Sequence, residues 1–504
     1  MTTAADRVRT TLVRSTVVTV VVTLSGSLLG LVRDLLLARF FGAGGGTDAF
    51  LVAWTVPETA FTLVVEGAMS FLMIPLFSRT LERSRQVVAG TLPRVVAVLA
   101  VLSAATAIGA PVLVHAVAPG LADPALAVTC TRLTSVTVLT FGLAGYLSAA
   151  LRANHVFGAP ATIHLAYNIG ILCLMWTLHG RLGIVSAAAG VALGSVFMVL
   201  AQVPSFLRHV GLPRHWRVAG STVTLGAFAP LAAYTLARQA QVFVERFLGS
   251  SLPPGTISHL NYAQKVAQLP MLVALLVCTV TFPTLARSVA AGEADVARRR
   301  LETDLRTVTA LILVAAAYLV AFAPVIVTVL LQHGAFTATD TGDTAAVLRV
   351  YAVGLLGQAL VGVLSRAFFT GERASWYPAV AMGAGLAVTT VLAVTTVPYL
   401  HAYAIAAANG TGITTTAVLL LAGMRGRVVA VSLSTVGTAT ARLAAAALGA
   451  GLAGRLCGQA MAGWPAPLVG LAGGVAVLAV FAGLAHVLGV DEIAQLSRRI
   501  HNGR

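Results

Sequence analysis

The sequence predicts an all-α polytopic membrane protein with fourteen transmembrane helices. Hydrophobic residues make up 58% of the 504 residues and charged residues only 10%, whereas a soluble globular protein carries about 25% charged residues. Apolar runs of about 20 residues, long enough to cross a bilayer as a helix, recur along the whole chain. Arginines gather in alternate loops between these runs, as they do in cytoplasmic loops. The three observations together exclude a soluble fold.

The apolar segments define the elements of the expected fold. Each one is predicted to form a helix that crosses the membrane once. In order, the fourteen segments span residues 16–38, 49–77, 95–117, 124–150, 158–179, 183–206, 221–247, 256–285, 308–331, 344–364, 377–398, 402–424, 436–454 and 465–489.

The basic residues indicate the orientation of these segments. With the amino terminus inside, the cytoplasmic stretches contain 23 of the 33 basic residues, and the opposite loops contain only Arg181 and Arg455. An odd number of spans would break this alternation. We therefore expect a multi-pass protein of the cell membrane with both termini in the cytoplasm.

The composition also excludes several classes of function. The net charge is +16, but the arginines are spread over short loops, which fits contact with anionic lipid better than nucleic-acid binding. A cleaved signal peptide is not expected, because the first segment continues into charged sequence. The four cysteines lack metal-ligand spacing and are expected to be small core residues: Cys130, Cys173, Cys278 and Cys457.

The sequence has no motif for covalent chemistry. It contains no GxxxxGK[ST] phosphate-binding loop, no HExxH and no GxSxG. We therefore expect a transporter rather than an enzyme, with no catalytic residue, no metal and no cofactor. Because ATP hydrolysis is excluded, transport is expected to draw on the membrane potential, an ion gradient or the substrate gradient.

Two pairs of short motifs indicate an internal repeat. Arg39-Phe-Phe-Gly42 and Pro75-Leu-Phe-Ser-Arg79 are matched six segments later by Arg246-Phe-Leu-Gly249 and Pro283-Thr-Leu-Ala-Arg287. The nearly equal spacing within the two pairs favours duplication of a six-helix unit; chance similarity is the alternative. An even offset gives two parallel copies, which is the arrangement of transporters with two lobes.

The repeat divides the chain into three expected domains. An amino-terminal lobe of six helices spans residues 1–218, a carboxy-terminal lobe of six helices spans 219–428, and two added helices with a short tail span 429–504. The substrate site is expected between the lobes near the membrane midplane, lined by the first hairpin of each lobe.

Ionised side chains in the first segment point to function. A charge at membrane depth costs about 2.5–3.5 kcal/mol, so such residues normally face a cavity and bind something. Arg33 and Asp34 lie near the outer end of this segment, and Arg39 follows almost two turns later. The alternative for Arg33 and Asp34 is a structural ion network, and for Arg39 it is a snorkelling position beside the outer turn.

The second segment adds three acidic residues. Asp48 opens it, and Glu58 and Glu66 are eight residues apart and share one helical face. Pro57 and the glycines of residues 42–46 allow irregular backbone, which a membrane tolerates only where protein or water satisfies the freed groups. Alternatively, Asp48 caps the segment and Glu66 belongs to the ion network.

Lys265 is the only lysine in the chain, against 32 arginines. It lies in the eighth segment, the repeat partner of the second, so we expect it to face Arg33 across the lobe interface. The two cations would bind an anionic head group while Asp34 holds Arg33 in place. Glu245 and Arg246 are expected to pair with each other. Three other arginines of the apolar segments are expected to snorkel or pack: Arg132, Arg349 and Arg442.

Six short stretches, taken together, are characteristic of one transporter family. They are Leu29-Gly-Leu-Val-Arg-Asp34, Ala38-Arg-Phe-Phe-Gly-Ala-Gly44, Thr47-Asp-Ala-Phe-Leu-Val-Ala53, Glu66-Gly-Ala-Met-Ser70, Tyr262-Ala-Gln-Lys265 and Gly334-Ala-Phe-Thr-Ala-Thr-Asp340. With Asn168 in the fifth segment, this set resembles the MurJ (MviN) family of lipid II flippases. That family belongs to the multidrug/oligosaccharidyl-lipid/polysaccharide exporter superfamily, and the similarity covers the whole chain.

The resemblance implies a function in cell-wall synthesis. The chain would move lipid II, the undecaprenyl-diphosphate-linked peptidoglycan precursor, from the cytoplasmic to the outer leaflet by alternating access. The thirteenth and fourteenth segments would form a groove for the polyprenyl tail. Expected partners are the lipid-linked precursor, membrane lipids and cell-wall synthesis proteins. Six charged residues match the family's site, the first three at its centre: Arg33, Asp34, Lys265, Arg39, Asp48 and Glu66.

The chain also departs from the family pattern. Ser27 stands where many members carry an arginine, Phe61 and Thr62 occupy the places of an arginine pair, and Lys265 replaces an arginine that would bind phosphate in a bidentate manner. An exporter of another polyprenyl-linked glycan is therefore an alternative function.

The sequence leaves two further functions as alternatives. The acidic residues of the second segment favour a multidrug or cation exporter of the same superfamily, whereas the paired cations count against it. A scaffold that recruits wall-synthesis enzymes without transport would tolerate neutralisation of every charge in the cavity.

Overall fold

The computed structural model describes residues 22, 25–78, 84–213, 229–291, 293–369 and 375–490. Within these ranges all regular structure is helical, which confirms the predicted all-α class. Every predicted segment lies largely on a helix wherever the structure describes it. The chain divides into two compact units, Met1–Gly255 and Thr256–Arg504. The three domains expected from the repeat, with boundaries at 218 and 428, stay a prediction.

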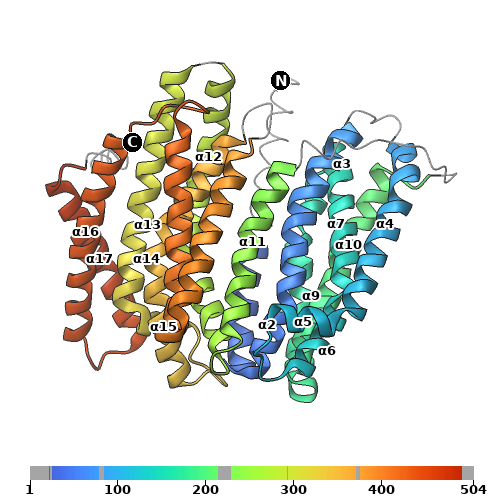
Figure 1. Ribbon diagram of the computed structural model, residues 1–504, viewed down its shortest axis with the longest axis horizontal. Helices are drawn as coiled ribbons and strands as arrows, with labels where there is room; N and C mark the ends of the chain where they lie inside the picture. Colours follow the sequence, from blue (N-terminus) through green and yellow to red (C-terminus); the bar gives the residue numbers. More distant parts are fainter. Residues whose placement is uncertain are drawn as a thin grey trace, which may run out of the picture. The chain divides into compact units, whose positions relative to one another are not determined.

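In the described part of the first unit, a helix over residues 25–41 is followed by eleven helical elements, most of which are labelled in Figure 1. They are α2 (Gly45–Ala60), η1 (Phe61–Ala68), α3 (Met69–Ser78), α4 (Ser84–Ile108), α5 (Ala110–Val117), α6 (Pro124–Thr134), α7 (Val136–Ala153), α8 (Gly158–Ala161), α9 (Ile163–Leu182) and α10 (Val185–His209), followed by α11 (Ala229–Gly249).

The described part of the second unit contains six helices of 22 to 48 residues. They are α12 (Thr256–Ala290), α13 (Ala294–Leu330), α14 (Ala338–Phe368), α15 (Tyr377–Met424), α16 (Leu433–Ala460) and α17 (Ala466–Val487). α15 covers two predicted segments and breaks at His401, whose φ of 49° lies in the left-handed region that L-residues rarely adopt. The break falls between residues 398 and 402, where the sequence predicts the end of one span and the start of the next.

The number of membrane spans is not confirmed at fourteen. Nine helices in the described part of the chain are long and apolar enough to cross a membrane. One reason for the lower number is that α15 joins two predicted spans across the kink at His401 and counts as one helix. Another is that α11 carries Arg238, Glu245 and Arg246 among its apolar residues. A polytopic membrane fold is confirmed, and the exact count stays a prediction.

Glycines bring α9 and α10 into close contact. A Cβ added to Gly170 would collide with the backbone of Gly194, and a Cβ on Gly194 would collide with the carbonyl oxygen of Tyr167. Small residues at such contacts let transmembrane helices approach closely and gain van der Waals contact. This packing fixes the position of α9, which carries Tyr167 and Asn168.

One hydrophobic core cluster of the first unit lies between α3, α4, α7 and α10. Phe77 packs edge-on against Tyr146 with ring centroids 5.6 Å apart, and the Tyr146 hydroxyl shares a hydrogen bond of 2.8 Å with Thr91. Ser148 donates a 2.7 Å hydrogen bond to Gln202, so α7 and α10 are also joined by a buried polar pair. Buried polar groups satisfied in this way fix one packing arrangement.

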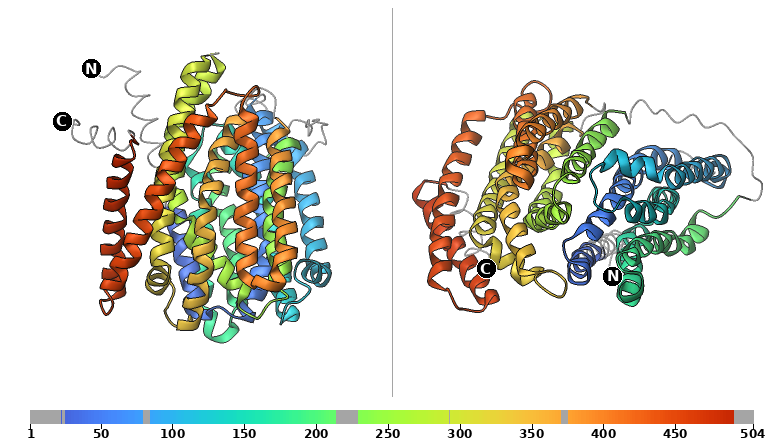
Figure 2. Two further views of the ribbon diagram at one scale, coloured as in Figure 1. Left: turned by 60° about the vertical axis from the view of Figure 1, so that its left-hand side comes forward. Right: turned by 60° about the horizontal axis from the view of Figure 1, so that its bottom comes forward.

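In the second unit, α16 and α17 pack against α13 (Figure 2). The ring of Phe322 on α13 fills a space that three glycines leave open. A Cβ on Gly454 or Gly458 would lie 3.1 Å from this ring, and one on Gly473 would collide with it. The two carboxy-terminal helices, α16 and α17, therefore pack against α13 through the Phe322 ring, which lies against glycines of both helices.

The α9–α10 contact predicts the effect of one substitution. Gly194→Val should destabilise the protein by about 1–3 kcal/mol, because a larger side chain in a close-packed contact forces the helices apart. Thermal unfolding of the purified protein in detergent would measure this. Gly180→Val, on the open side of α9 with nothing within 4 Å, is the matched control. Equal melting temperatures for the two variants would contradict the assigned contact.

Candidate functional site

Arg33 lies at the centre of a group of polar and aromatic side chains in the first unit. It projects from the helix over residues 25–41 and is paired with the next residue. Its Nη2 lies 2.8 Å and its Nε 3.0 Å from the same Asp34 carboxylate oxygen. Both side chains are only 12–13% exposed. The expected pairing of Asp34 with Arg33 is thus confirmed, while their role in binding stays a prediction.

Asn168 on α9 holds the guanidinium from another side. Its amide oxygen accepts a 3.2 Å hydrogen bond from Nη1 of Arg33. Its amide nitrogen donates to the carbonyl oxygens of Gly26 at 3.0 Å and His164 at 2.9 Å. Because both nitrogen protons are used by backbone carbonyls, the amide oxygen is directed at Arg33. Asn168 therefore positions the cation and ties the first helix to α9.

Trp54 on α2 provides the third contact of Arg33. The guanidinium carbon lies 4.3 Å from the centre of the indole ring, which is within the range of a cation–π interaction. A guanidinium has five N–H donors, and the bonds to Asp34 and Asn168 use three of them. The two remaining N–H groups, on a part-exposed side chain, match the oxygens of a phosphate or carboxylate.

The backbone beside this group is irregular, as the proline and glycines of the sequence predict. Gly42 has a φ of +64° where the first helix ends, and α2 contains Pro57 and passes directly into the π-helical η1. π-Helical turns are rare and occur frequently at functional sites. Glu66 lies on the backbone of η1, and its side chain is outside the described residues.

Phe61 occupies one of the two places where the resemblance seen in the sequence leads us to expect arginine. Its ring packs edge-on against Phe141, with centroids 5.2 Å apart, and against His164 at 5.5 Å. The neighbouring Thr62 donates its hydroxyl to the Glu58 carbonyl oxygen of its own helix. These two positions therefore contribute apolar packing and a satisfied hydroxyl in place of two cations.

Asp48 lies in the first turn of α2 and is 4% exposed. Its carboxylate accepts a 2.6 Å hydrogen bond from the backbone N–H of Gly255. Gly255 has a φ of +95°, a conformation that favours glycine. Asp48 thus holds the segment after α11 through a hydrogen bond. Its expected role in substrate binding stays a prediction.

Arg39 and Lys265, two further predicted site residues, are described within their own units. Arg39 is exposed near the end of its helix, where the adjacent Phe40 stacks on His179 at 4.2 Å. Lys265 is partly buried on α12 of the second unit, so its expected position facing Arg33 stays a prediction. In α11, Glu245 and Arg246 form a buried ion pair of 3.1 Å, as expected.

Two aromatic residues of the site were not expected from the sequence. Trp54 stacks on Arg33, and the buried Tyr167, next to Asn168, packs edge-on against Phe141 at 5.5 Å. In an apolar segment an aromatic residue fits a lipid-facing or core position equally well. The position of Tyr167 beside Asn168 is the only sequence signal that would have suggested it.

A family model decides the classification. The model of the lipid II flippase MurJ matches residues 37–464 of this chain. The chain belongs to the MurJ family. The match includes α2, α9 and α12 and therefore most of the elements described above, and it agrees with the resemblance seen in the sequence motifs.

Curated relatives of the MurJ family are similar over most of their length. The lipid II flippase MurJ of Burkholderia cenocepacia is 27% identical over 424 residues, covering 80% of this chain and 82% of the relative. The probable lipid II flippase MurJ of Rhizobium meliloti is 28% identical over 410 residues, covering 77% and 76%.

Solved structures share the fold. A lipid II flippase MurJ in an inward closed conformation has a TM-score of 0.80 at 20% identity, covering 95% of this chain and all of that one. An inward-facing multidrug resistance MATE family transporter of the MOP superfamily has a TM-score of 0.68 at 14% identity, covering 83% and 98%. At these identities the likeness concerns the fold alone.

The contact of Asp48 with Gly255 predicts different effects for two substitutions. Asp48→Ala should lower stability by about 1–3 kcal/mol, because it leaves a buried N–H group without its acceptor. Asp48→Asn should retain most of the stability, since an amide oxygen can still accept this hydrogen bond. Thermal unfolding in detergent would compare the variants. Equal losses would show that the charge of Asp48, rather than its hydrogen bond, is required.

Proposed function

We propose that this protein is a flippase that moves lipid II from the cytoplasmic to the outer leaflet of the membrane. Membership of the MurJ family over residues 37–464 carries the proposal. The Arg33 group adds chemical support, because it holds a largely buried cation with donor groups left for an anionic ligand. As a lipid flippase of this family, the protein is a transporter rather than an enzyme.

The diphosphate of the substrate is the natural ligand of this cation. Asp34, Asn168 and Trp54 hold the Arg33 guanidinium in one orientation, so little side-chain freedom remains to be lost on binding. Asp34 also neutralises Arg33 in the absence of substrate. A second cation is therefore needed to give the site a net positive charge, and we assign this role to Lys265.

One observation favours a second candidate substrate. Phe61 packs on Phe141 and His164 where many family members have an arginine, so fewer cations are available for the polar head group. A precursor with a less acidic head group, on the same polyprenyl carrier, would need fewer cations. An exporter of another polyprenyl-linked glycan is therefore the second candidate function.

The carboxy-terminal helices have the surface that a polyprenyl tail needs. Along α16 and α17 the exposed large side chains are mainly leucine and valine, among them Leu448 at 71% and Leu471 at 71% exposure. A tail on these helices would stay in an apolar environment while the head group moves. This would explain two helices that have no counterpart in the repeat.

The orientation and the energy source belong to the same proposal. The distribution of arginines supports a protein of the cell membrane with both termini in the cytoplasm. Transport would need no cofactor and would draw on the membrane potential or an ion gradient. Proteins of cell-wall synthesis are the partners expected to use the flipped precursor.

Loss of either cation should abolish transport. Arg33→Ala and Lys265→Ala should each fail to support growth of a flippase-depleted strain, and lipid-linked precursor should not become accessible at the outer leaflet. The exposed Arg181→Ala is the control for removal of a cation and should behave as the wild type. Normal growth of either site variant at a normal protein level would contradict the diphosphate assignment.

The same accessibility assay separates the candidate substrates. Membranes that contain lipid II should show outer-leaflet precursor in the presence of this protein. If only a carrier with a different head group becomes accessible, the second candidate function replaces the first.

Collapse of the membrane potential should slow outward transport. An inside-negative potential favours the outward movement of an anion by about 2.3 kcal/mol per charge per 100 mV. Valinomycin with external potassium should therefore lower the rate at which precursor appears at the outer leaflet of cells. An unchanged rate would contradict this prediction. If the rate falls only when an ion gradient is removed, that gradient is the energy source of transport.

A further inference from the structure

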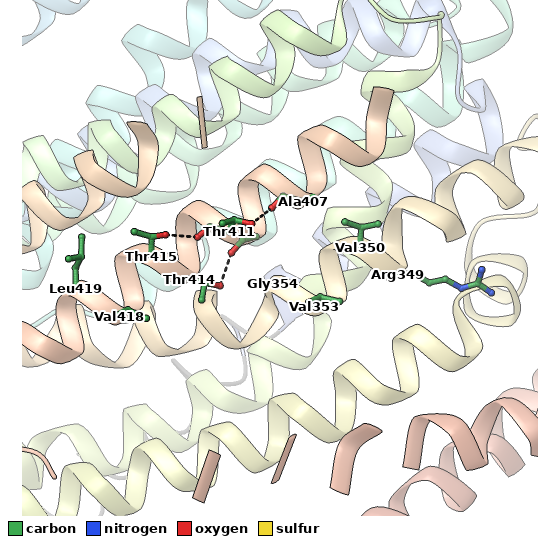
Figure 3. Close-up of a pocket in the computed structure, with 11 residues that line it drawn as sticks. Arg349, Val350, Val353, Gly354, Ala407, Thr411, Thr414, Thr415, Val418 and Leu419 are labelled. Atoms are coloured by element: carbon green, nitrogen blue, oxygen red, sulfur yellow. Dashed lines mark hydrogen bonds between the residues drawn. The ribbon is translucent and has the colours of Figure 1, made fainter. Parts of the chain in front are cut away.

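A groove runs along the surface of the second unit between α14 and α15 (Figure 3). Arg349 is the one cationic side chain among the residues that line it. The groove encloses about 640 Å³. Val353 of α14 and Val418 of α15 line it and are 77% and 60% exposed. Arg349 lies at one end of the groove in Figure 3, and Leu419 lies at the other.

The groove opens on the side of α14 that faces away from α12. α12 contacts α14 through His259, whose Nδ1 lies 3.0 Å from the Thr344 hydroxyl. Arg349 is five residues beyond Thr344, which corresponds to a rotation of about 140° around an α-helix. Exposed valines on this far side of a membrane helix are the side chains expected at a surface that contacts lipid.

The threonines of the groove do not make its wall polar. Thr411, Thr414 and Thr415 each donate their hydroxyl to a carbonyl oxygen one turn earlier in α15, at 2.7–2.9 Å (Figure 3). With these donors satisfied inside the helix, the wall presents methyl groups and no unpaired hydroxyl proton. A hydrocarbon chain can lie against such a surface without leaving a polar donor unsatisfied.

Glycines form the floor of the groove. A Cβ on Gly354 of α14 would lie only 2.6 Å from the Cα of Gly410 of α15. The two backbones therefore meet directly, and the side chains on either side of this contact stand apart. The depression is a consequence of this close helix crossing rather than of a flexible side chain.

The position of Arg349 suits the charged head of a membrane lipid. It is exposed and lies five residues, about 8 Å, along the helix from the polar first turns of α14. Helical side chains point toward the amino-terminal end of their helix, so Arg349 is directed to the nearer membrane surface. A snorkelling arginine at this depth attracts an anionic head group.

We propose that this groove binds a bilayer phospholipid with an anionic head group, such as phosphatidylglycerol. The phosphate contacts Arg349, and one acyl chain lies along α14 and α15 over Gly354 and Gly410. Its lining residues all belong to the second unit, and its ligand is a resident of the membrane rather than the transported precursor.

Native mass spectrometry of the purified full chain with added phosphatidylglycerol or phosphatidylcholine tests the head-group contact. Arg349→Gln should reduce retained phosphatidylglycerol relative to phosphatidylcholine by about fivefold, the effect of one arginine near an anionic membrane surface. Arg455→Gln, an exposed arginine of α16, is the matched control and should leave the ratio unchanged. An equal ratio in both variants would overturn the proposal.

A second pair of variants tests where the acyl chain binds and leaves the charge of Arg349 unchanged. Val353→Trp should fill the groove and lower retention of both phospholipids, whereas Val380→Trp, at a 65% exposed valine of α15, should not. Retention unaffected by Val353→Trp would overturn the proposal. Retention of added polyprenyl diphosphate in place of phospholipid, lost in Arg349→Gln, would also overturn it and assign the groove to the carrier lipid.

Discussion

The structure of the first unit depends on the partners that the largely buried Arg33 guanidinium requires. A buried arginine is unfavourable unless its charge is paired and its N–H groups are hydrogen-bonded. Asp34 supplies the charge, Asn168 an acceptor and Trp54 an aromatic face. These partners come from three helices, so the three helices must approach one another at this level. A residue that binds a ligand thereby also determines how its helices pack.

Glycines make this approach sterically possible. A Cβ on Gly26 would lie 2.7 Å from the Cβ of His164, so only glycine lets the first helix lie this close to α9. On its other side α9 meets α10 through Gly170 and Gly194. Asn168 is therefore carried by a helix that is fixed on two faces, and the hydrogen bonds of its amide nitrogen to Gly26 and His164 direct its oxygen at Arg33. Precise positioning here results from backbone contact between helices rather than from large side chains.

Much of this arrangement follows from the sequence, and the remainder has identifiable reasons. Composition and apolar runs predict an all-α membrane fold, and adjacent opposite charges predict the pairs of Arg33 with Asp34 and of Glu245 with Arg246. Trp54 is not predicted as a partner of Arg33, because an aromatic residue in an apolar segment has no distinguishing pattern.

Backbone geometry is predicted less completely than side-chain pairing. Pro57 indicates irregular backbone but not a π-helix over Phe61–Ala68, since the i→i+5 hydrogen bonds of a π-helix leave no periodic pattern in so short a segment. The number of spans also depends on backbone detail, because a single residue, His401, interrupts α15 between two predicted segments. Local sequence determines which residues are apolar, whereas tertiary contacts determine where a helix bends or continues.

The hydrogen bond between Asp48 and Gly255 has a consequence for the order of folding. The two residues are 207 positions apart, so the contact closes a long loop, and such contacts form late. Asp48 emerges early during synthesis, but it can gain this acceptor role only after α11 and the turn that follows it have been made and inserted. Formation of this bond therefore requires the whole chain of the first unit, which ends at Gly255.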